Sequence, residues 1–188
     1  MQVSIQWYPG HMAKTKRELR ENLAVVDMVL EVRDARIPLS SHNVDLARLV
    51  EGKPVITILA KADLAVPKLT AAWVQALEQE GLPTVALDLT SRRGLGELQT
   101  MISSQYQTVN QRLEERGRRR RSLRGLVVGV PNVGKSTLIN RLARRSVAKT
   151  GAKPGVTRGK QWVRVGSDLQ LMDVPGGLVD GPVYTSIY

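Results

Sequence analysis

The segment from Gly129 to Thr137 places the strongest constraint on this chain. It reads Gly-Val-Pro-Asn-Val-Gly-Lys-Ser-Thr and fits the pattern G-x-x-x-x-G-K-[ST]. In such a loop, backbone N–H groups and the N-terminus of the following helix converge on phosphate oxygens. Lys135 is then placed to reach the β- and γ-phosphates, and the Ser136 hydroxyl to ligate a bridging Mg²⁺. The sequence therefore predicts a binding site for a nucleoside di- or triphosphate.

The residues on either side of the loop support this prediction. Residues 126–129 read as a short buried strand, and residues 136–145 carry Leu138, Ile139 and Leu142 on one face of a predicted helix. A strand, a glycine-rich loop and a helix in this order are the setting that a phosphate-binding loop requires. The loop alone does not choose between adenine and guanine. We expect nucleotide contacts from Pro131, Asn132, Val133, Gly134, Lys135, Ser136 and Thr137.

Composition bounds the class of protein. A chain of 188 residues with 42% hydrophobic residues forms one or at most two domains with a genuine core. The absence of Cys excludes disulfides and thiolate metal sites. Apolar runs are too short for a membrane span and the N-terminus does not resemble a signal peptide, so we expect a cytoplasmic protein. The net charge of +11 points to a polyanionic partner, most simply RNA.

Apolar periodicity predicts an α/β fold. Predicted helices cover residues 12–25, 43–50, 68–80, 95–115 and 136–145, after an irregular start over residues 1–11. Predicted strands cover residues 27–33, 54–59, 84–87, 126–129, 161–165 and 169–172. Their alternation, broken only by a hairpin between the last two strands, predicts a mixed, mostly parallel six-stranded sheet with helices on both faces.

Residues 116–121 contain five arginines in six positions. Such a run cannot pack into a core, so we expect an exposed linker before the strand that leads into the phosphate-binding loop. Two interpretations stay open for it. The arginines either surround a solvated hinge or contact RNA.

Besides the Ser136 hydroxyl, a carboxylate is expected near the Mg²⁺. Asp173, which ends a predicted buried strand, is placed to supply it. The Gly176 N–H, three residues later, is placed to meet a γ-phosphate. Thr157 lies in the Gly- and Lys-rich residues 147–160 and is a candidate to close on the Mg²⁺ when a γ-phosphate is bound. The predicted metal ligands are therefore Ser136, Thr157 and Asp173.

The order of these motifs is unusual. The loop at Gly129, Thr157 and the Asp-x-x-Gly that ends at Gly176 resemble three of the five motifs of the translation-factor-like GTPases. The other two, Asn/Thr-Lys-x-Asp and Ser-Ala-x, resemble residues 60–63 (Ala-Lys-Ala-Asp) and residues 90–92 (Thr-Ser-Arg). Both lie upstream of the loop here, which is a circularly permuted order.

Two further segments narrow the resemblance. Residues 7–13 read Trp-Tyr-Pro-Gly-His-Met-Ala, and residues 34–40 read Asp-Ala-Arg-Ile-Pro-Leu-Ser. With them, the chain resembles the RbgA/YlqF family of ribosome-assembly GTPases over nearly all of residues 6–176. Permutation is physically acceptable because a linker that joins the old ends, here residues 116–121, leaves the strands and their ligand site in place.

The resemblance implies a P-loop NTPase three-layer sandwich, with a circularly permuted G domain at residues 1–176 and a tail at residues 177–188 that cannot form the family's C-terminal RNA-contacting domain. It implies a monomeric GTPase that binds GTP or GDP with Mg²⁺ and hydrolyses GTP to GDP and phosphate when stimulated by the ribosome. Its implied partners are the large ribosomal subunit and its rRNA, and no membrane. Its implied role is a switch in assembly of that subunit.

The resemblance also assigns individual residues. Asp63 would accept from the guanine N1–H and N2–H₂ while the Lys61 stem covers the base, and Ser91 would contact the base edge. Asn132 resembles an asparagine that helps to bind a monovalent cation, usually K⁺. His11 is nominated as a catalytic residue that orients or deprotonates water, whereas we expect a structural role for His42.

Departures from the family pattern keep other functions open. Ala60 stands where an Asn is expected, and Gly177 stands where a bulky apolar residue is usual. The missing amide hydrogen bonds are expected to weaken guanine affinity about tenfold or more. One alternative is therefore a basic RNA-binding or ribosome-binding assembly module with a decayed nucleotide site. An ATPase is a further alternative, against which Asp63 argues.

Overall fold

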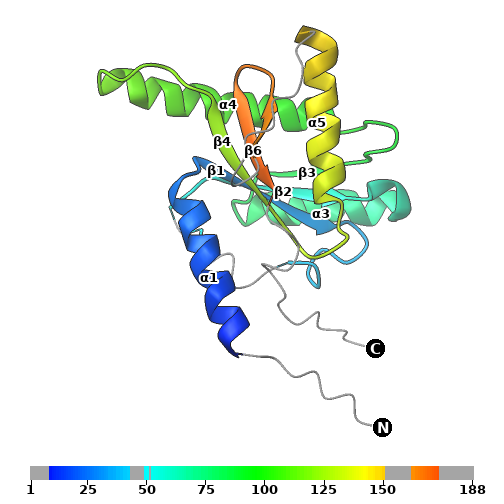
Figure 1. Ribbon diagram of the computed structural model, residues 1–188. Coiled ribbons are helices and arrows are strands. Elements are labelled where there is room, and N and C mark those ends of the chain that lie inside the picture. The colour runs from blue at the N-terminus through cyan, green and yellow to red at the C-terminus, as the bar shows by residue number, and fades with distance from the viewer. Residues whose placement is uncertain (1–8, 43–48, 51, 151–161, 174–188) are drawn as a thin grey trace.

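The structure, a computed structural model, describes residues 9–42, 49–50, 52–150 and 162–173, and for residues 9–16, 145–150 and 173 only the backbone. Helices and strands alternate along most of this part of the chain (Figure 1). In chain order they are α1 (Pro9–Ala24), β1 (Met28–Asp34), β2 (Val55–Ala60), the short 3₁₀ helix η1 (Ala62–Leu64), α3 (Pro67–Gln79), β3 (Thr84–Ala86), α4 (Leu95–Glu115), β4 (Leu123–Val128), α5 (Lys135–Thr150), β5 (Trp162–Val165) and β6 (Leu169–Asp173).

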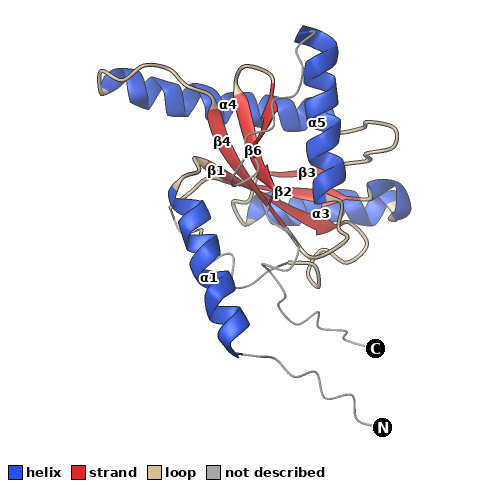
Figure 2. Ribbon diagram, in the orientation of Figure 1, coloured by secondary structure: helices blue, strands red, loops and turns tan. Residues whose placement is uncertain are grey.

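The strands form one six-stranded sheet in the order β3-β2-β1-β4-β6-β5. Every neighbouring pair is parallel except β5 with β6, which form an antiparallel hairpin at one end of the sheet. Helices α4 and α5 cover one face, and α1 and α3 cover the other (Figure 2). The predicted mixed, mostly parallel sheet between two helical layers is confirmed.

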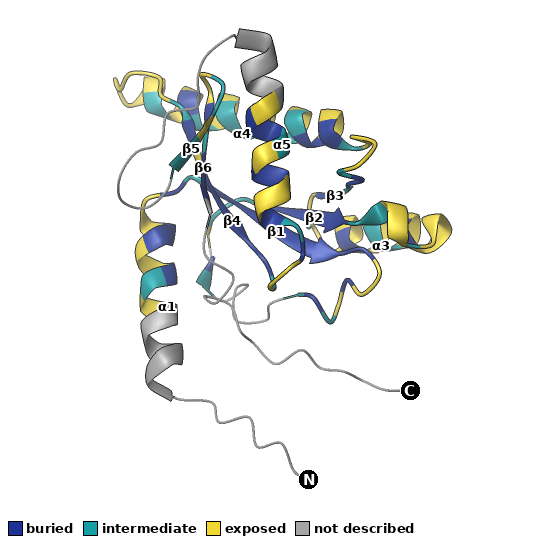
Figure 3. Ribbon diagram, turned by 45° about the vertical axis from the view of Figure 1, so that its right-hand side comes forward, coloured by how far each residue is buried: buried dark blue, intermediate teal, exposed yellow. Residues whose placement is uncertain are grey.

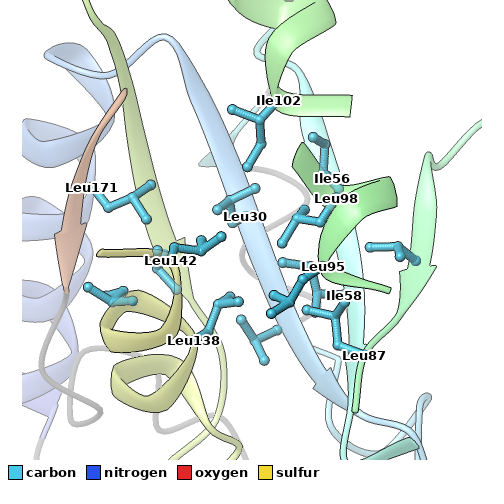
Figure 4. Close-up of a cluster of buried hydrophobic side chains, with 14 of the residues drawn as sticks. Leu30, Ile56, Ile58, Leu87, Leu95, Leu98, Ile102, Leu138, Leu142 and Leu171 are labelled. Atoms are coloured by element: carbon cyan, nitrogen blue, oxygen red, sulfur yellow. The ribbon is translucent and has the colours of Figure 1, made fainter. Parts of the chain in front are cut away.

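The core follows the alternation of side chains along the buried strands. In β1, Met28, Leu30 and Val32 face α4 and α5, whereas Val29 faces α1. The larger cluster lies between the sheet and helices α4 and α5, where leucine and isoleucine side chains interdigitate (Figure 4). It contains no aromatic residue among its fully enclosed members, as expected for a chain without Phe. These contacts fix β1 and β4 as the two central strands.

Some boundaries differ from the sequence prediction. Helix α1 begins at Pro9 instead of residue 12, because proline is well suited to the first helical turn. Strand β4 begins at Leu123, since the exposed Arg124 interrupts the apolar run that the prediction relied on. Helix α5 continues to Thr150 through residues predicted to be loop. The predicted helix at residues 43–50 lies largely outside the described residues.

The arginine-rich segment is exposed, as predicted, but its last residue is anchored. Arg121 donates to both carboxylate oxygens of Asp27 at 2.7 Å. Its backbone N–H donates to Asn110 Oδ1 at 2.8 Å, and its carbonyl accepts from Asn110 Nδ2 at 3.1 Å. Asn110 is 1% exposed, so these bonds lie against α4. The exposed linker is therefore fixed to the fold at Arg121.

The one histidine with a described side chain lies on the α1 face of the sheet. His42 Nδ1 is 2.7 Å from Glu31 Oε1, and Arg33 Nη2 donates to Glu31 Oε2 at 2.8 Å. Glu31 and Arg33 are both buried. Burial raises the pKa of Glu31, but the hydrogen bonds with His42 and Arg33 and the charge of Arg33 outweigh it, so that the pKa is lowered. Among the helices that the structure describes, none is long and apolar enough to cross a membrane.

Candidate nucleotide-binding site

The predicted nucleotide contacts within the described residues gather at one edge of the sheet. Strands β1, β2, β3, β4 and β6 run parallel, so their C-terminal ends lie together. The register places Asp34 of β1 beside Ala60 of β2, and Asp173 of β6 beside Val127 of β4. Open α/β sheets bind ligands at this edge.

The loop between β4 and α5 is held tightly against the sheet. A Cβ on Gly129 would lie 2.3 Å from the Val32 carbonyl oxygen of β1, a contact that only glycine avoids. The side chain of Val133, 1% exposed, anchors the middle of the loop in the core. Asn132 has φ 59°, so the chain passes through a left-handed turn beside Gly134, whose φ is 113°. Backbone N–H groups in such a turn form a concave binding surface for anions.

Lys135 begins α5 and turns back over the loop. Its Nζ donates to the carbonyl oxygens of Gly129 at 2.8 Å and Val130 at 2.9 Å, and the side chain is largely buried. The ammonium therefore lies within the loop at the N-terminus of a helix, where its charge adds to the positive potential that the helix dipole already supplies for anions. Ser136 and Thr137 follow in the first turn of α5 and are exposed, as are Pro131 and Asn132 in the loop. Phosphate oxygens have direct access to these groups.

The Lys61–Asp63 segment lies at the end of β2. Lys61 adopts a left-handed backbone conformation with φ 58°, and the following N–H of Ala62 donates to the Leu87 carbonyl at 3.1 Å. This bond ties the segment to the end of β3. Asp63 lies in η1 and is exposed. Ala60, where an Asn was expected, is 1% exposed and packed among apolar residues.

Asp34 is an unpredicted member of this site. Its Oδ2 lies 3.2 Å from Lys61 Nζ, and Arg36 donates to both carboxylate oxygens at 2.9 and 2.7 Å. The Arg36 guanidinium, followed by Lys61, holds the pKa of Asp34 far below its usual range. An ionised Asp34 therefore ties Lys61 to the end of β1. The sequence pattern showed the segment that begins at Asp34 but offered no signal for this contact.

We expect Asp34→Asn to lower guanine nucleotide affinity about five- to tenfold, since Lys61 loses its charged partner. It also removes a stabilising contribution that is fully present above the ordinary Asp pKa of about 3.9 and is lost as the pH falls toward the lower native value. Urea unfolding should therefore separate variant from wild type most widely at pH 7, and the separation should shrink progressively as the pH falls below about 3.9. The control is Asp168→Asn in the exposed β5–β6 turn. Equal affinity in both variants would contradict this role for Asp34.

Ser91 lies in a loop that is organised by a second unpredicted carboxylate, Asp88. Asp88 accepts hydrogen bonds from the backbone N–H groups of Thr90 and Ser91, and from the Ser91 hydroxyl. These bonds, the hydroxyl contact above all, lower the pKa of Asp88. The same loop approaches the phosphate-binding loop, because Leu89 Cδ1 would lie 3.7 Å from a Cβ on Gly134. The structure thus brings the Ser91 loop and the phosphate-binding loop together.

The structure leaves other predicted site residues without side-chain description. His11 falls in the first turn of α1 and Asp173 ends β6, and for both only the backbone is described. Thr157 and Gly176 lie outside the described residues. Within the described part of the chain there is no cluster of His, Cys, Asp and Glu side chains suited to hold a metal ion by themselves.

The fold and the loop together define a class of protein. A mostly parallel sheet with a phosphate-binding loop between β4 and α5, and with the Lys61 and Ser91 segments on strands that come earlier in the chain, is a P-loop nucleotide-binding domain with circularly permuted order.

Comparison with known proteins gives the family. The family described as 50S ribosome-binding GTPase matches residues 124–185. Ribosome biogenesis GTPase A of Bacillus licheniformis is 46% identical over 172 residues, covering 92% of this chain and 61% of the relative. The protein of the same name in Bacillus pumilus is 44% identical over 174 residues, covering 93% and 62%. The crystal structure of GNP-bound YlqF from T. maritima has a TM-score of 0.57 at 30% identity, covering 86% of this chain and 57% of that chain.

This chain belongs to the RbgA/YlqF family of circularly permuted GTPases. It spans about three fifths of the length of the curated relatives that it matches. The resemblance stated from the motifs is thereby confirmed.

Proposed function

We propose that this chain is the GTP-binding and GTP-hydrolysing domain of a cytoplasmic switch that acts in assembly of the large ribosomal subunit. The arrangement of Lys135 within the loop that follows β4 carries this proposal, because it holds a cation inside a loop of the kind that binds the phosphates of a nucleotide. The names of the relatives and the nucleotide bound to the T. maritima protein support guanine as the base and the ribosome as the partner. We propose residues 1–176 as one G domain.

Guanine recognition is proposed for the segments at the ends of β2 and β3. Asp63 is exposed and lies in η1, after β2. Its carboxylate can accept from the N1–H and N2–H₂ of guanine, a donor pair that adenine lacks. Lys61, tied to Asp34, places its aliphatic stem over the base. Ser91, fixed by Asp88, supplies a contact at the base edge. The Asp34 contact stabilises this arrangement without the Asn that Ala60 replaces.

For the phosphates we propose the loop from Pro131 through Gly134, with Lys135, Ser136, Thr137 and the Gly176 N–H. A Mg²⁺ ion fits the oxygen donors Ser136, Thr157 and Asp173, of which Ser136 is exposed at the N-terminus of α5. When bound, Mg²⁺ neutralises charge that develops between the β- and γ-phosphates. Asn132, exposed in its left-handed turn, is the candidate ligand for K⁺.

His11 is the proposed catalytic residue, which orients or accepts a proton from the attacking water when the large subunit is bound. We expect His11→Ala to keep its guanine nucleotide affinity and to lose ribosome-stimulated GTP turnover. His42→Gln, which changes the chain's other histidine, is the control and should retain stimulation. Full stimulation of the His11→Ala variant would refute a catalytic role.

The experiment that tests the proposed function is displacement of a fluorescent guanine nucleotide by unlabelled GTP, GDP and ATP in the presence of Mg²⁺ and K⁺. We expect GTP and GDP to compete at micromolar concentrations and ATP not to compete, because of Asp63. Replacing K⁺ by Na⁺ tests the role of Asn132. If no nucleotide binds, the alternative of an RNA-binding module with a decayed site is supported instead.

A further inference from the structure

The face of the sheet that packs on α1 extends beyond that helix, onto the outer strands β6 and β5. Four side chains there form what we call the Arg–Trp surface: Arg124 of β4, Gln170 of β6, and Arg164 and Trp162 of β5. Arg124 and Arg164 are exposed, whereas Trp162 and Gln170 are partly exposed. Strand β5 is the outermost strand on this side (Figure 3). This surface lies outside the proposed nucleotide site.

Strand register places these residues in rows. Gln170 pairs with Arg124 on one side and with Arg164 on the other, so the two arginines are two strand spacings apart, roughly 10 Å. The next row contains Trp162, paired with Met172 of β6. Because alternate residues point to the same face, all of these side chains share the face on which Trp162 and Met172 contact the α1 core cluster.

The contacts within the surface leave its charges available. The Arg124 guanidinium lies over the Trp162 ring, with Cζ 5.7 Å from the ring centroid. Gln170 Nε2 donates to Ser122 Oγ at 2.8 Å, which directs the amide away from Arg164. Within the described residues, neither Arg124 nor Arg164 is paired with a carboxylate, in contrast with Arg120 and Arg121.

No acidic residue lies in β4 or β5, and in β6 only the terminal Asp173 is acidic. Two arginine side chains without a paired carboxylate among the described residues, beside a partly exposed indole, suit a ligand that has both phosphates and exposed aromatic faces. Single-stranded nucleic acid has this combination, whereas paired bases in a duplex present only their edges and backbone. An acidic peptide would satisfy the arginines but supply no aromatic ring to stack on the exposed part of Trp162.

We propose that the Arg–Trp surface binds single-stranded RNA. Its phosphates would contact Arg124 and Arg164, and an unpaired base would stack on the exposed part of the Trp162 indole. The choice of RNA over other single strands rests on the proposed function in ribosome assembly. The surface is carried by β6, whose last residue is Asp173, so RNA binding and the Mg²⁺ site proposed above share one strand.

The test is fluorescence anisotropy of a labelled single-stranded RNA 15-mer of mixed sequence, measured from 50 to 300 mM KCl on the full chain. We expect Arg124→Gln/Arg164→Gln to lower affinity about tenfold at 100 mM salt and to reduce the salt slope by about 1.4, roughly 0.7 for each phosphate that is no longer neutralised. Trp162→Leu should lower affinity about fivefold or more by removing the stacking surface. The matched control is Arg141→Gln/Arg144→Gln on α5, which removes equal charge on the opposite face.

Displacement of a fluorescent guanine nucleotide is measured on the same proteins. Unchanged nucleotide affinity in the Arg124/Arg164 variant shows that the variant is folded. Because nucleotide binding is measured separately from RNA binding, an incorrect RNA surface can be distinguished from an incorrect proposed function. The proposal is overturned if wild type does not bind the RNA, if both double variants lose affinity equally, or if a matched RNA duplex or a poly-glutamate peptide binds as well as the single strand.

Discussion

Lys135→Ala is expected to lower the affinity for GTP and GDP by about 100-fold or more, which corresponds to about 2.7 kcal/mol. Lys135 is the cation inside the phosphate-binding loop, and its Nζ donates to the carbonyl oxygens of Gly129 and Val130. The variant therefore loses the charge that we propose to face the β- and γ-phosphates, and also the bonds to the loop carbonyls. Displacement of a fluorescent guanine nucleotide measures this loss.

Lys68→Ala is the matched control for Lys135→Ala, because Lys68 is exposed in α3 and lies outside the proposed site. It removes the same charge and should bind GTP like wild type. Circular dichroism of both variants checks that the sheet is intact. Nucleotide affinity that is unchanged in Lys135→Ala would contradict the assignment of the loop.

Gly129→Ala is expected to destabilise the chain by about 2–4 kcal/mol and to lower nucleotide affinity at least about tenfold. The added Cβ would lie 2.3 Å from the Val32 carbonyl oxygen, a backbone atom in the central strand β1. Either β1 shifts or the loop moves away from the sheet, and both displace Lys135. Urea unfolding and nucleotide displacement measure these effects separately.

Gly96→Ala is the control for Gly129→Ala. Gly96 lies in the first turn of α4, and a Cβ there would meet nothing within 4 Å. Since alanine is the better helix former, this substitution should stabilise the chain by about 0.5–1 kcal/mol and leave nucleotide affinity unchanged. If the two alanine variants unfold alike, the close approach of Gly129 to β1 is not what constrains the loop.

The order and type of the described elements could be predicted because each signal is local. Buried parallel strands read as apolar runs, and α4 shows its helical spacing over its full predicted length from Leu95 to Glu115. Strand β4 shows where apolar content fails as a signal. Arg124 is exposed near the beginning of this otherwise buried strand, so the apolar run alone predicts that the strand begins too late. Likewise, the charge of Arg121 predicted exposure, but its anchoring depends on Asn110 and Asp27, which are distant in sequence.

The candidate site, too, has residues that a local sequence signal predicted and residues that it did not. The phosphate-binding loop is contiguous, and its sequence was enough to place the start of the following helix within one residue of Lys135. Asp34 and Asp88 were not predicted as site residues. The role of Asp34 depends on a partner brought close by the fold, and that of Asp88 depends on local hydrogen bonds from Thr90 and Ser91 that no motif marked. Asp34 reaches Lys61 across two neighbouring strands, and Asp88 organises the loop that contains Ser91. No sequence motif marks a carboxylate whose role is to position another residue.

The strand order divides the sheet at its centre into two consecutive halves of the chain. Strands β1, β2 and β3 come from the part before the arginine-rich segment, and β4, β5 and β6 from the part after it, so β1 and β4 form the one strand pair that joins them in the described sheet. The segments proposed to read the base belong to the first half, and the loop proposed to hold the phosphates belongs to the second. A bound nucleotide would therefore act as a cross-link between the halves, and amide exchange along the β1–β4 ladder would report its binding and release.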